Sequence, residues 1–152
     1  MSIGQRLYLL ERKIRGYYNV DRLTPETRRR AEIYMNWFDH AILRKVWTNF
    51  AKIAPDVYRS NQPPHKRFVE MKAIGIRTVL NLRGESIAAH YLVEKESCEQ
   101  LDLKLVSRAL NARKAAPRED VQAVLSAFRE VEKPVLIHCK SGADRAGFAS
   151  AM

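Results

Sequence analysis

From residue 53 onward, short apolar runs alternate with amphipathic segments, and this alternation limits the fold more than any other feature. The last apolar run, Pro134-Val135-Leu136-Ile137, is typical of a strand that is buried on both faces of a parallel sheet. Before it, the segment that Pro117 opens places apolar residues on one helix face: Val121, Val124, Leu125 and Phe128. Strands separated by helices predict an α/β fold with a mostly parallel central sheet flanked by helices.

The same alternation predicts the earlier elements of the domain. We expect strands at 57–60, 77–83 and 103–109, one helix that begins at Pro64 and another near 88–100. Gly75 closes the first of these helices, because glycine readily adopts the left-handed conformation of a helix end. Residues 111–116 form a polar loop before the helix opened by Pro117.

Residues 1–52 have a different pattern, which predicts an N-terminal helical extension ahead of an α/β domain at 53–152. Residues 3–15 combine basic side chains with an apolar stripe at helical spacing: Ile3, Leu7, Leu10 and Ile14. We expect this stripe to pack on the domain. Contact of the basic helix with a membrane surface, or with a partner, is the alternative.

A second helix is expected to begin at Thr24-Pro25-Glu26, with Thr24 as the N-cap and proline at the first helical position. It should run to about Val46. Along this length it should bury four apolar side chains: Ile33, Trp37, Phe38 and Ile42.

The composition sets the class of partner and the compartment. A net charge of +10 favours anionic partners such as phosphorylated substrates, acidic membrane surfaces or nucleic acid. No nucleic-acid-binding motif is recognised, so nucleic acid is not expected.

No stretch approaches the ~18 apolar residues of a membrane span, and no secretory signal is evident, so we expect a cytoplasmic protein. Cys98 and Cys139 form neither a disulfide framework nor a metal-ligand cluster, so neither a metal nor a cofactor is expected.

The segment His138 to Arg145 lies between the last apolar strand and an expected helix at 143–152, and it carries the candidate chemistry. A short loop in this position directs successive backbone N–H groups into one concavity, which can bind an anion. We expect the phosphate-binding residues to be Lys140, Ser141, Gly142, Ala143, Asp144 and Arg145. The same amides would stabilise a Cys139 thiolate, and Arg145 would bind two phosphoryl oxygens. The implied reaction is in-line attack by sulfur, a cysteinyl-phosphate intermediate and hydrolysis by water.

Residues 138–145 resemble the HCxxGxxR loop of the protein tyrosine and dual-specificity phosphatase superfamily. Residues 57–63 and 75–83 resemble the start of the domain in compact atypical dual-specificity phosphatases of bacteria, fungi and plants. The resemblance covers about residues 53–152 and implies a phosphatase that acts on phosphotyrosine or phosphoserine/threonine in proteins. It makes Cys139 the nucleophile, Arg145 the phosphate clamp and His138 a supporting residue. Lys140 either adds positive charge for the substrate or faces solvent.

The chain departs from the family pattern at the general acid. The loop 110–116, where the family carries an aspartate, has no carboxylate. Asp144 is the first candidate to replace that aspartate, and the alternative for it is an ion pair with Arg145 or Arg113. Asp120 is the second candidate, with capping of a helix N-terminus as its alternative.

Two further departures concern the residues after Arg145. Ala146 stands where many members have a Ser or Thr whose hydroxyl helps the thiolate to leave, and only seven residues follow Arg145 where family domains usually continue. C-terminal truncation, or a homo-oligomer that covers the sheet, is therefore an open expectation.

These departures leave other functions open. Phosphoinositide or inositol phosphate hydrolysis is the alternative within the class, because a basic surface and Lys140 suit polyanions. A phosphate-binding module with little turnover is the alternative outside it, and rhodanese-like sulfur transfer is a weaker one. Cys98 is expected to be structural rather than a redox partner, and Arg83 contacts either substrate or Glu85.

Overall fold

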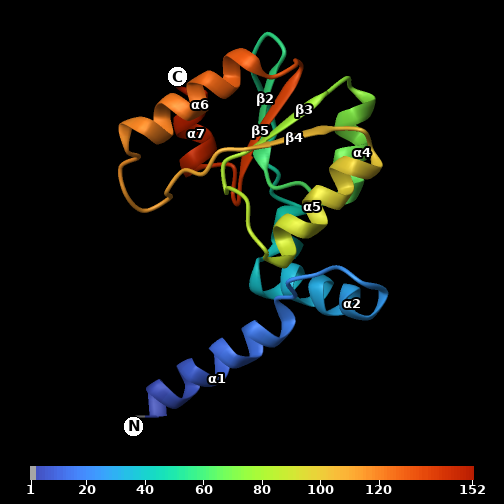
Figure 1. Cartoon of the computed structure of the whole chain (residues 1–152), viewed down its shortest axis with the longest axis vertical. Coiled ribbons are helices and arrows are strands. Elements are labelled where there is room, and N and C mark those ends of the chain that lie inside the picture. The colour runs from blue at the N-terminus through green and yellow to red at the C-terminus, as the bar shows by residue number, and fades with distance from the viewer. Residues whose placement is uncertain (1–2) are drawn as a thin grey trace. The chain divides into compact units, whose positions relative to one another are not determined.

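The structure is a computed structural model that describes residues 3–152 (Figure 1). These residues form two compact units: residues 3–42 with 86–93, and residues 43–85 with 94–152. The second unit holds the sheet and all the candidate site residues. Within the described range, none of the helices combines the length and the apolar character that crossing a membrane requires.

A five-stranded sheet in the order β1-β2-β5-β3-β4 forms the centre of the second unit. Its strands are β1 (Ala51–Ala54), β2 (Val57–Asn61), β3 (Thr78–Asn81), β4 (Lys104–Ser107) and β5 (Val135–Cys139). Four of them run parallel, and β1 pairs antiparallel with β2 at one edge. The predicted α/β fold with a mostly parallel sheet is confirmed, and so is the burial of β5, the central strand. The edge strand β1 was not predicted.

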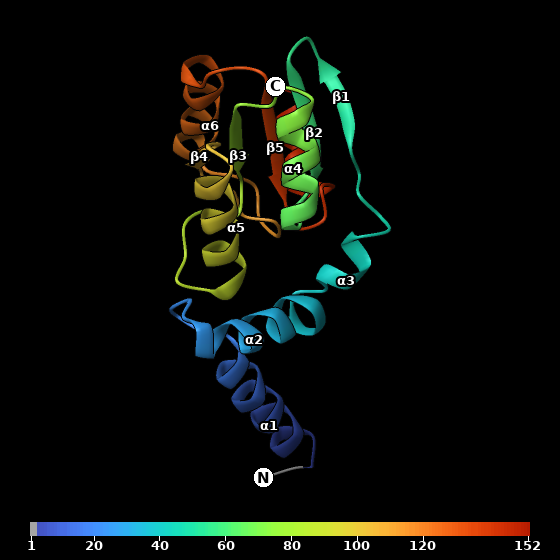
Figure 2. The same cartoon turned by 90° about the vertical axis from the view of Figure 1, so that its right-hand side faces the viewer.

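Helices cover both faces of this sheet (Figure 1). On one face lie α6 (Arg118–Glu130) and α7 (Asp144–Ser150), where Val124 and Ala149 share a buried cluster with Ile137 of β5. On the other face lie α4 (His65–Ala73) and the part of α5 (Ala89–Gln100) from Glu94 onward, both in front of the sheet in Figure 2. There Phe68 and Cys98 pack with Leu136. Successive residues of β5 thus face opposite helical layers.

The first unit contains α1 (Ile3–Tyr18), α2 (Pro25–Ile33) and the π-helical turn η1 (Tyr34–Phe38). The predicted N-cap is confirmed, because the Thr27 amide donates to Thr24 Oγ1 at 3.3 Å. The second helix is shorter than predicted. The π turn follows α2, and His40 adopts a φ of 59° before the short α3 (Ala41–Arg44). Trp37 and Ile42 are exposed, so the prediction of their burial is wrong.

The apolar stripe of α1 is exposed. No side chain of this helix is buried; Ile3 is 79% exposed and Leu7 is 61% exposed. The predicted helix is therefore present, and none of its residues is buried within its own unit. The helix also extends beyond residue 15 as far as Tyr18, whose ring stacks on Phe38 within the same unit.

Candidate active site

The segment 138–145 lies at the carboxyl end of the central strand and leads into α7. Cys139 is the last residue of β5, is paired in register with Asn61 of β2, and is only 1% exposed. In open α/β sheets, ligands bind beyond the carboxyl ends of the strands. The predicted loop therefore occupies the position where a binding site is expected.

The loop after Cys139 curls back toward the sulfur. The Gly142 amide donates a hydrogen bond to Cys139 Sγ at 3.2 Å, with a Gly142 φ of 75°. One side chain and one main-chain amide bind the carbonyl groups of the loop: Asn49 Nδ2 donates to the carbonyl of Ser141 at 2.8 Å, and the backbone N–H of Gln62 donates to the carbonyl of Lys140 at 3.3 Å. A main-chain donor directed at the sulfur stabilises negative charge there.

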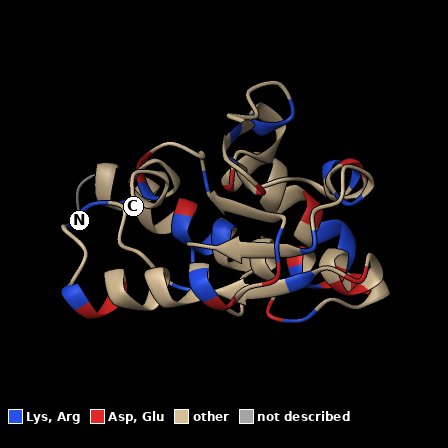
Figure 3. Ribbon diagram, turned by 90° about the horizontal axis from the view of Figure 1, so that it is seen from above, with Lys and Arg blue, Asp and Glu red and all other residues tan. Residues whose placement is uncertain are grey.

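Arg145 lies close enough to Cys139 and to Arg83 for the charges of the three side chains to act on one another. Burial lowers the pKa of Arg145 below its ordinary value; the charge of Cys139 opposes this shift, and the neighbouring Arg83 guanidinium adds to it. Two guanidinium groups therefore lie close enough to repel each other next to a thiol. This arrangement favours an anion placed between them. Elsewhere, basic and acidic residues are interleaved along the elements (Figure 3).

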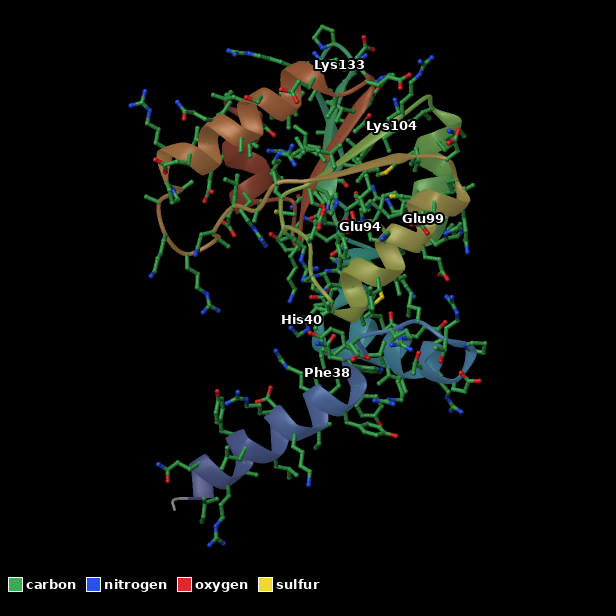
Figure 4. All side chains as sticks on the ribbon, in the orientation of Figure 1. Phe38, His40, Glu94, Glu99, Lys104 and Lys133 are labelled. Atoms are coloured by element: carbon green, nitrogen blue, oxygen red, sulfur yellow. The ribbon has the colours of Figure 1, made fainter. Side chains whose placement is uncertain are left out.

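His138 is fully buried beneath the loop, and its ring contacts a carboxylate. Its Nε2 is hydrogen bonded to Glu94 Oε1 of α5, and its Nδ1 lies 3.4 Å from the carbonyl oxygen of Cys139. The other carboxylate oxygen, Glu94 Oε2, accepts a hydrogen bond from Gln62 Nε2 at 2.6 Å, and Gln62 Oε1 accepts one from Arg83. Figure 4 labels Glu94 on α5. The histidine is thus part of a buried polar network that reaches Arg83.

Sequence reasoning missed Glu94 and Gln62. One signal was available for Glu94, because it falls on the same helical face as Ser97 and Cys98, three and four positions later. All three side chains are buried. A charged residue on the buried face of a helix indicates a partner across the core.

Asp144 and Asp120, the two candidates for a general acid, are placed differently. Asp144 is exposed at the start of α7 and lines a hollow of about 200 Å³ together with Arg145, Phe148 and residues of the loop 110–116. Its charge acts on Arg145. Asp120 lies in the first turn of α6 and is not among the residues that line this hollow. The structure therefore brings Asp144, and not Asp120, to the arginine.

The remaining predicted residues lie in the loop or next to it. Lys140 is half-buried, and the exposed Ser141 hydroxyl accepts from the Ala143 amide at 3.4 Å. Ala146 is fully buried. Arg83 donates a hydrogen bond to Gln62 Oε1, whereas the partners expected for it were substrate or Glu85.

Cys98 lies in the core between α5 and the sheet, away from the loop. It is buried with Phe68, Met71 and Leu136. Burial, with the charges of Glu94 and Glu99 acting in the same direction, raises the pKa of this thiol to about 12. A thiol that stays protonated is unreactive, which supports the structural role expected for Cys98.

Comparison with protein families places the sheet and loop in a known group. A family model described as "DSP-PTPase phosphatase fused to NAD+ Kinase" matches residues 49–152, which is more than half of the chain. A curated relative from Oryza sativa subsp. japonica, inositol diphosphatase DSP2, is 28% identical over 116 residues, which cover 73% of this chain and 55% of the relative. The chain therefore spans about half the length of that relative.

Solved structures share the fold at lower identity. The core catalytic domain of the PP-IP phosphatase SIW14 from S. cerevisiae matches with a TM-score of 0.57 and 23% identity, over 67% of this chain and 62% of that one. TpbA from P. aeruginosa matches with a TM-score of 0.54 and 23% identity, over 68% of this chain and 61% of that one. A putative phosphatase from Neisseria meningitidis matches with a TM-score of 0.56 and 22% identity, over 66% of this chain and 72% of that one.

Proposed function

Because the chain belongs to the family of DSP-PTPase phosphatases fused to NAD+ kinase, we propose that it hydrolyses phosphoric monoesters with Cys139 as the nucleophile. One observation carries this proposal. The Cys139 sulfur, at the carboxyl end of the central strand, accepts a hydrogen bond from the Gly142 amide and lies within electrostatic reach of the Arg145 guanidinium. Such donors stabilise a sulfur anion and then bind phosphoryl oxygens that take its place as acceptors.

The proposed reaction has two steps. In the first, the Cys139 thiolate attacks phosphorus, an S–P bond forms, and the ester P–O bond breaks as the leaving oxygen takes a proton. In the second, water attacks phosphorus, the S–P bond breaks, and inorganic phosphate leaves while the thiolate returns. Arg145 binds two phosphoryl oxygens throughout, and the amides of residues 140–144 supply further donors. His138 lies buried beneath the loop, where Glu94 holds its ring.

Asp144 is the proposed proton donor to the leaving oxygen. It lines the hollow that also exposes Arg145, so a leaving group directed into this hollow would lie near its carboxyl group. The alternative role is an ion pair that orients Arg145, which the attraction between the two charges also supports. The two roles differ in their dependence on the leaving group.

Two substrate classes fit the site. Phosphotyrosine or phosphoserine/threonine in proteins is the first. The second is a phosphoinositide or inositol phosphate, and one observation favours it: Arg83 places a second guanidinium near Arg145, which suits a substrate with more than one phosphate. Hydrolysis rates for a phosphotyrosine peptide and a soluble inositol polyphosphate would separate the classes. The second class predicts a higher kcat/KM for the polyphosphate and loss of that preference in Arg83→Met.

The test of the chemistry is a burst assay with p-nitrophenyl phosphate. Sustained turnover in the wild type that is abolished in Cys139→Ser, and retained in Cys98→Ser, is the expected result. A stoichiometric burst that stalls would instead identify a phosphate-binding module that traps its intermediate. Thiosulfate turnover without any phosphatase activity would identify sulfur transfer.

A further inference from the structure

Four side chains beneath the loop form a single hydrogen-bonded series: His138, Glu94, Gln62 and Arg83. Glu94 is at its centre and is only 2% exposed. Its two oxygens serve different partners, the histidine next to Cys139 and the glutamine that holds Arg83. One carboxylate is therefore connected to both the nucleophile and the second guanidinium of the site.

The direction of each hydrogen bond follows from the chemistry of the groups. A guanidinium only donates, so Gln62 must present its oxygen to Arg83 and its NH₂ group to Glu94. Glu94 Oε2 is then an acceptor. An ionised carboxylate also accepts at Oε1, from the Nε2–H group of His138. Glu94 thus accepts from both of its neighbours in the series, Gln62 and His138.

Resting on the proposed phosphatase function, we propose that Glu94 is a positioning residue of the site. It fixes the ring of His138 under Cys139 and, through the Gln62 amide, the guanidinium of Arg83 beside Arg145. It touches no substrate itself.

Gln62 ties the same series to the loop by its main chain. Its amide N–H donates to the carbonyl of Lys140, the residue after the nucleophile, while its side chain holds Arg83. Arg83 and Arg145 repel each other, and the hydrogen bond from Arg83 to Gln62 opposes this repulsion. Displacement of Arg83 or His138 by about 1 Å would be enough to slow the reaction substantially.

Burial of a carboxylate is energetically unfavourable. The cost of its removal from water is offset only when both oxygens have donors. An apolar residue at position 94 would avoid that cost, but it would leave Gln62 Nε2 and His138 Nε2 without their acceptor. The position on α5 therefore fits a residue kept for the geometry of the site.

The test uses the isosteric variant Glu94→Gln. Its amide has one oxygen for two donors, so either Gln62 or His138 loses its acceptor, or the histidine must change its tautomer. We expect kcat/KM for p-nitrophenyl phosphate to fall about tenfold or more, with the protein still folded. Glu99→Gln is the matched control, because Glu99 lies on the same helix, is exposed, and makes the same change of charge (Figure 4).

A reciprocal exchange separates positioning from charge. In Gln62→Glu/Glu94→Gln, the new carboxylate accepts from Arg83 and from the new amide, whose oxygen accepts from His138. All the hydrogen bonds of the series are restored, so most of the lost kcat/KM should return, whereas Gln62→Glu alone places two carboxylates together and should be worse. A folded exchange variant no better than Glu94→Gln would overturn the proposal. If the exchange variant does not fold, Glu94→Gln against Glu99→Gln carries the test.

An assay without turnover distinguishes this proposal from the phosphatase function. We expect iodoacetamide to alkylate Cys139 as the loop opens, and bound phosphate to protect it. Glu94→Gln should lower this protection several-fold, while Glu99→Gln should not change it. A wild type that binds phosphate but never hydrolyses an ester would refute the function alone. Unchanged turnover and unchanged protection in Glu94→Gln would refute the positioning role alone.

Discussion

Gly142 lies so close to the end of β2 that a β-carbon at its position would stand 2.5 Å from the amide nitrogen of Asn61. Asn61 is also the register partner of Cys139. The loop therefore folds back over the neighbouring strand, and this close approach allows the Gly142 amide to reach the sulfur. The positive φ of 75° is a second reason that only glycine fits.

Gly142→Ala should destabilise the protein and disable the site. The new methyl group meets backbone atoms, which cannot move as a flexible side chain can, and the positive φ adds strain. We expect the free energy of unfolding to fall by about 2 kcal/mol or more. Urea unfolding would measure it. Gly75→Ala is the control, because Gly75 also has a positive φ but open space around it, so its cost should be about 1 kcal/mol. Equal costs for the two variants would contradict the close packing of the loop.

Arg145→Lys should keep the charge and lose the paired donors. The lysine ammonium is a point charge that cannot bind two phosphoryl oxygens in a fork, so transition-state stabilisation should suffer. We expect kcat/KM for an aryl phosphate to fall about 100-fold or more, a loss similar to that of a main oxyanion donor. Steady-state kinetics would measure it, with the exposed Arg118→Lys as the control. A loss below fivefold would show that charge alone suffices.

Asp144→Asn should slow alkyl phosphates more than aryl phosphates. An alkoxide is a poor leaving group and needs a proton, whereas a nitrophenolate leaves without one. A general acid contributes ~10²–10⁴-fold, so we expect a loss in that range for the alkyl ester and a smaller loss for the aryl ester. Asp120→Asn is the comparison, because that residue does not line the hollow. An equal loss for both esters would instead assign Asp144 to the orientation of Arg145.

The features that sequence predicted are those encoded within short stretches. The apolar run of β5, the spaced glycine of the loop and the Thr24 cap each depend on neighbours in the chain. The missed features depend on distant partners. Glu94 acquires its role from Gln62 and His138, which lie 32 and 44 residues away in sequence. The short β1 has a half-exposed pattern and is defined by its pairing with β2.

The end of α2 was missed for a related reason. Residues 34–38 have helical character throughout, and the sequence contains no proline or glycine that would end the helix there. The π turn and the positive φ of His40 therefore interrupt a pattern that, read locally, continues to Val46.

Cys98 should make the stability of the protein fall at high pH. Its pKa is raised from 9.0 to about 12 in the folded protein, mainly by burial, so the unfolded chain loses the thiol proton first as the pH rises. Its stabilising contribution is complete below pH 9 and is lost as the pH rises toward 12. Denaturant unfolding of wild type and Cys98→Ala between pH 8 and about 10.5 would isolate this effect. Although the variant leaves a small cavity and should start less stable at pH 8, its free energy of unfolding should decline less steeply. Parallel declines would show that Cys98 ionises as easily in the folded protein as in the unfolded chain.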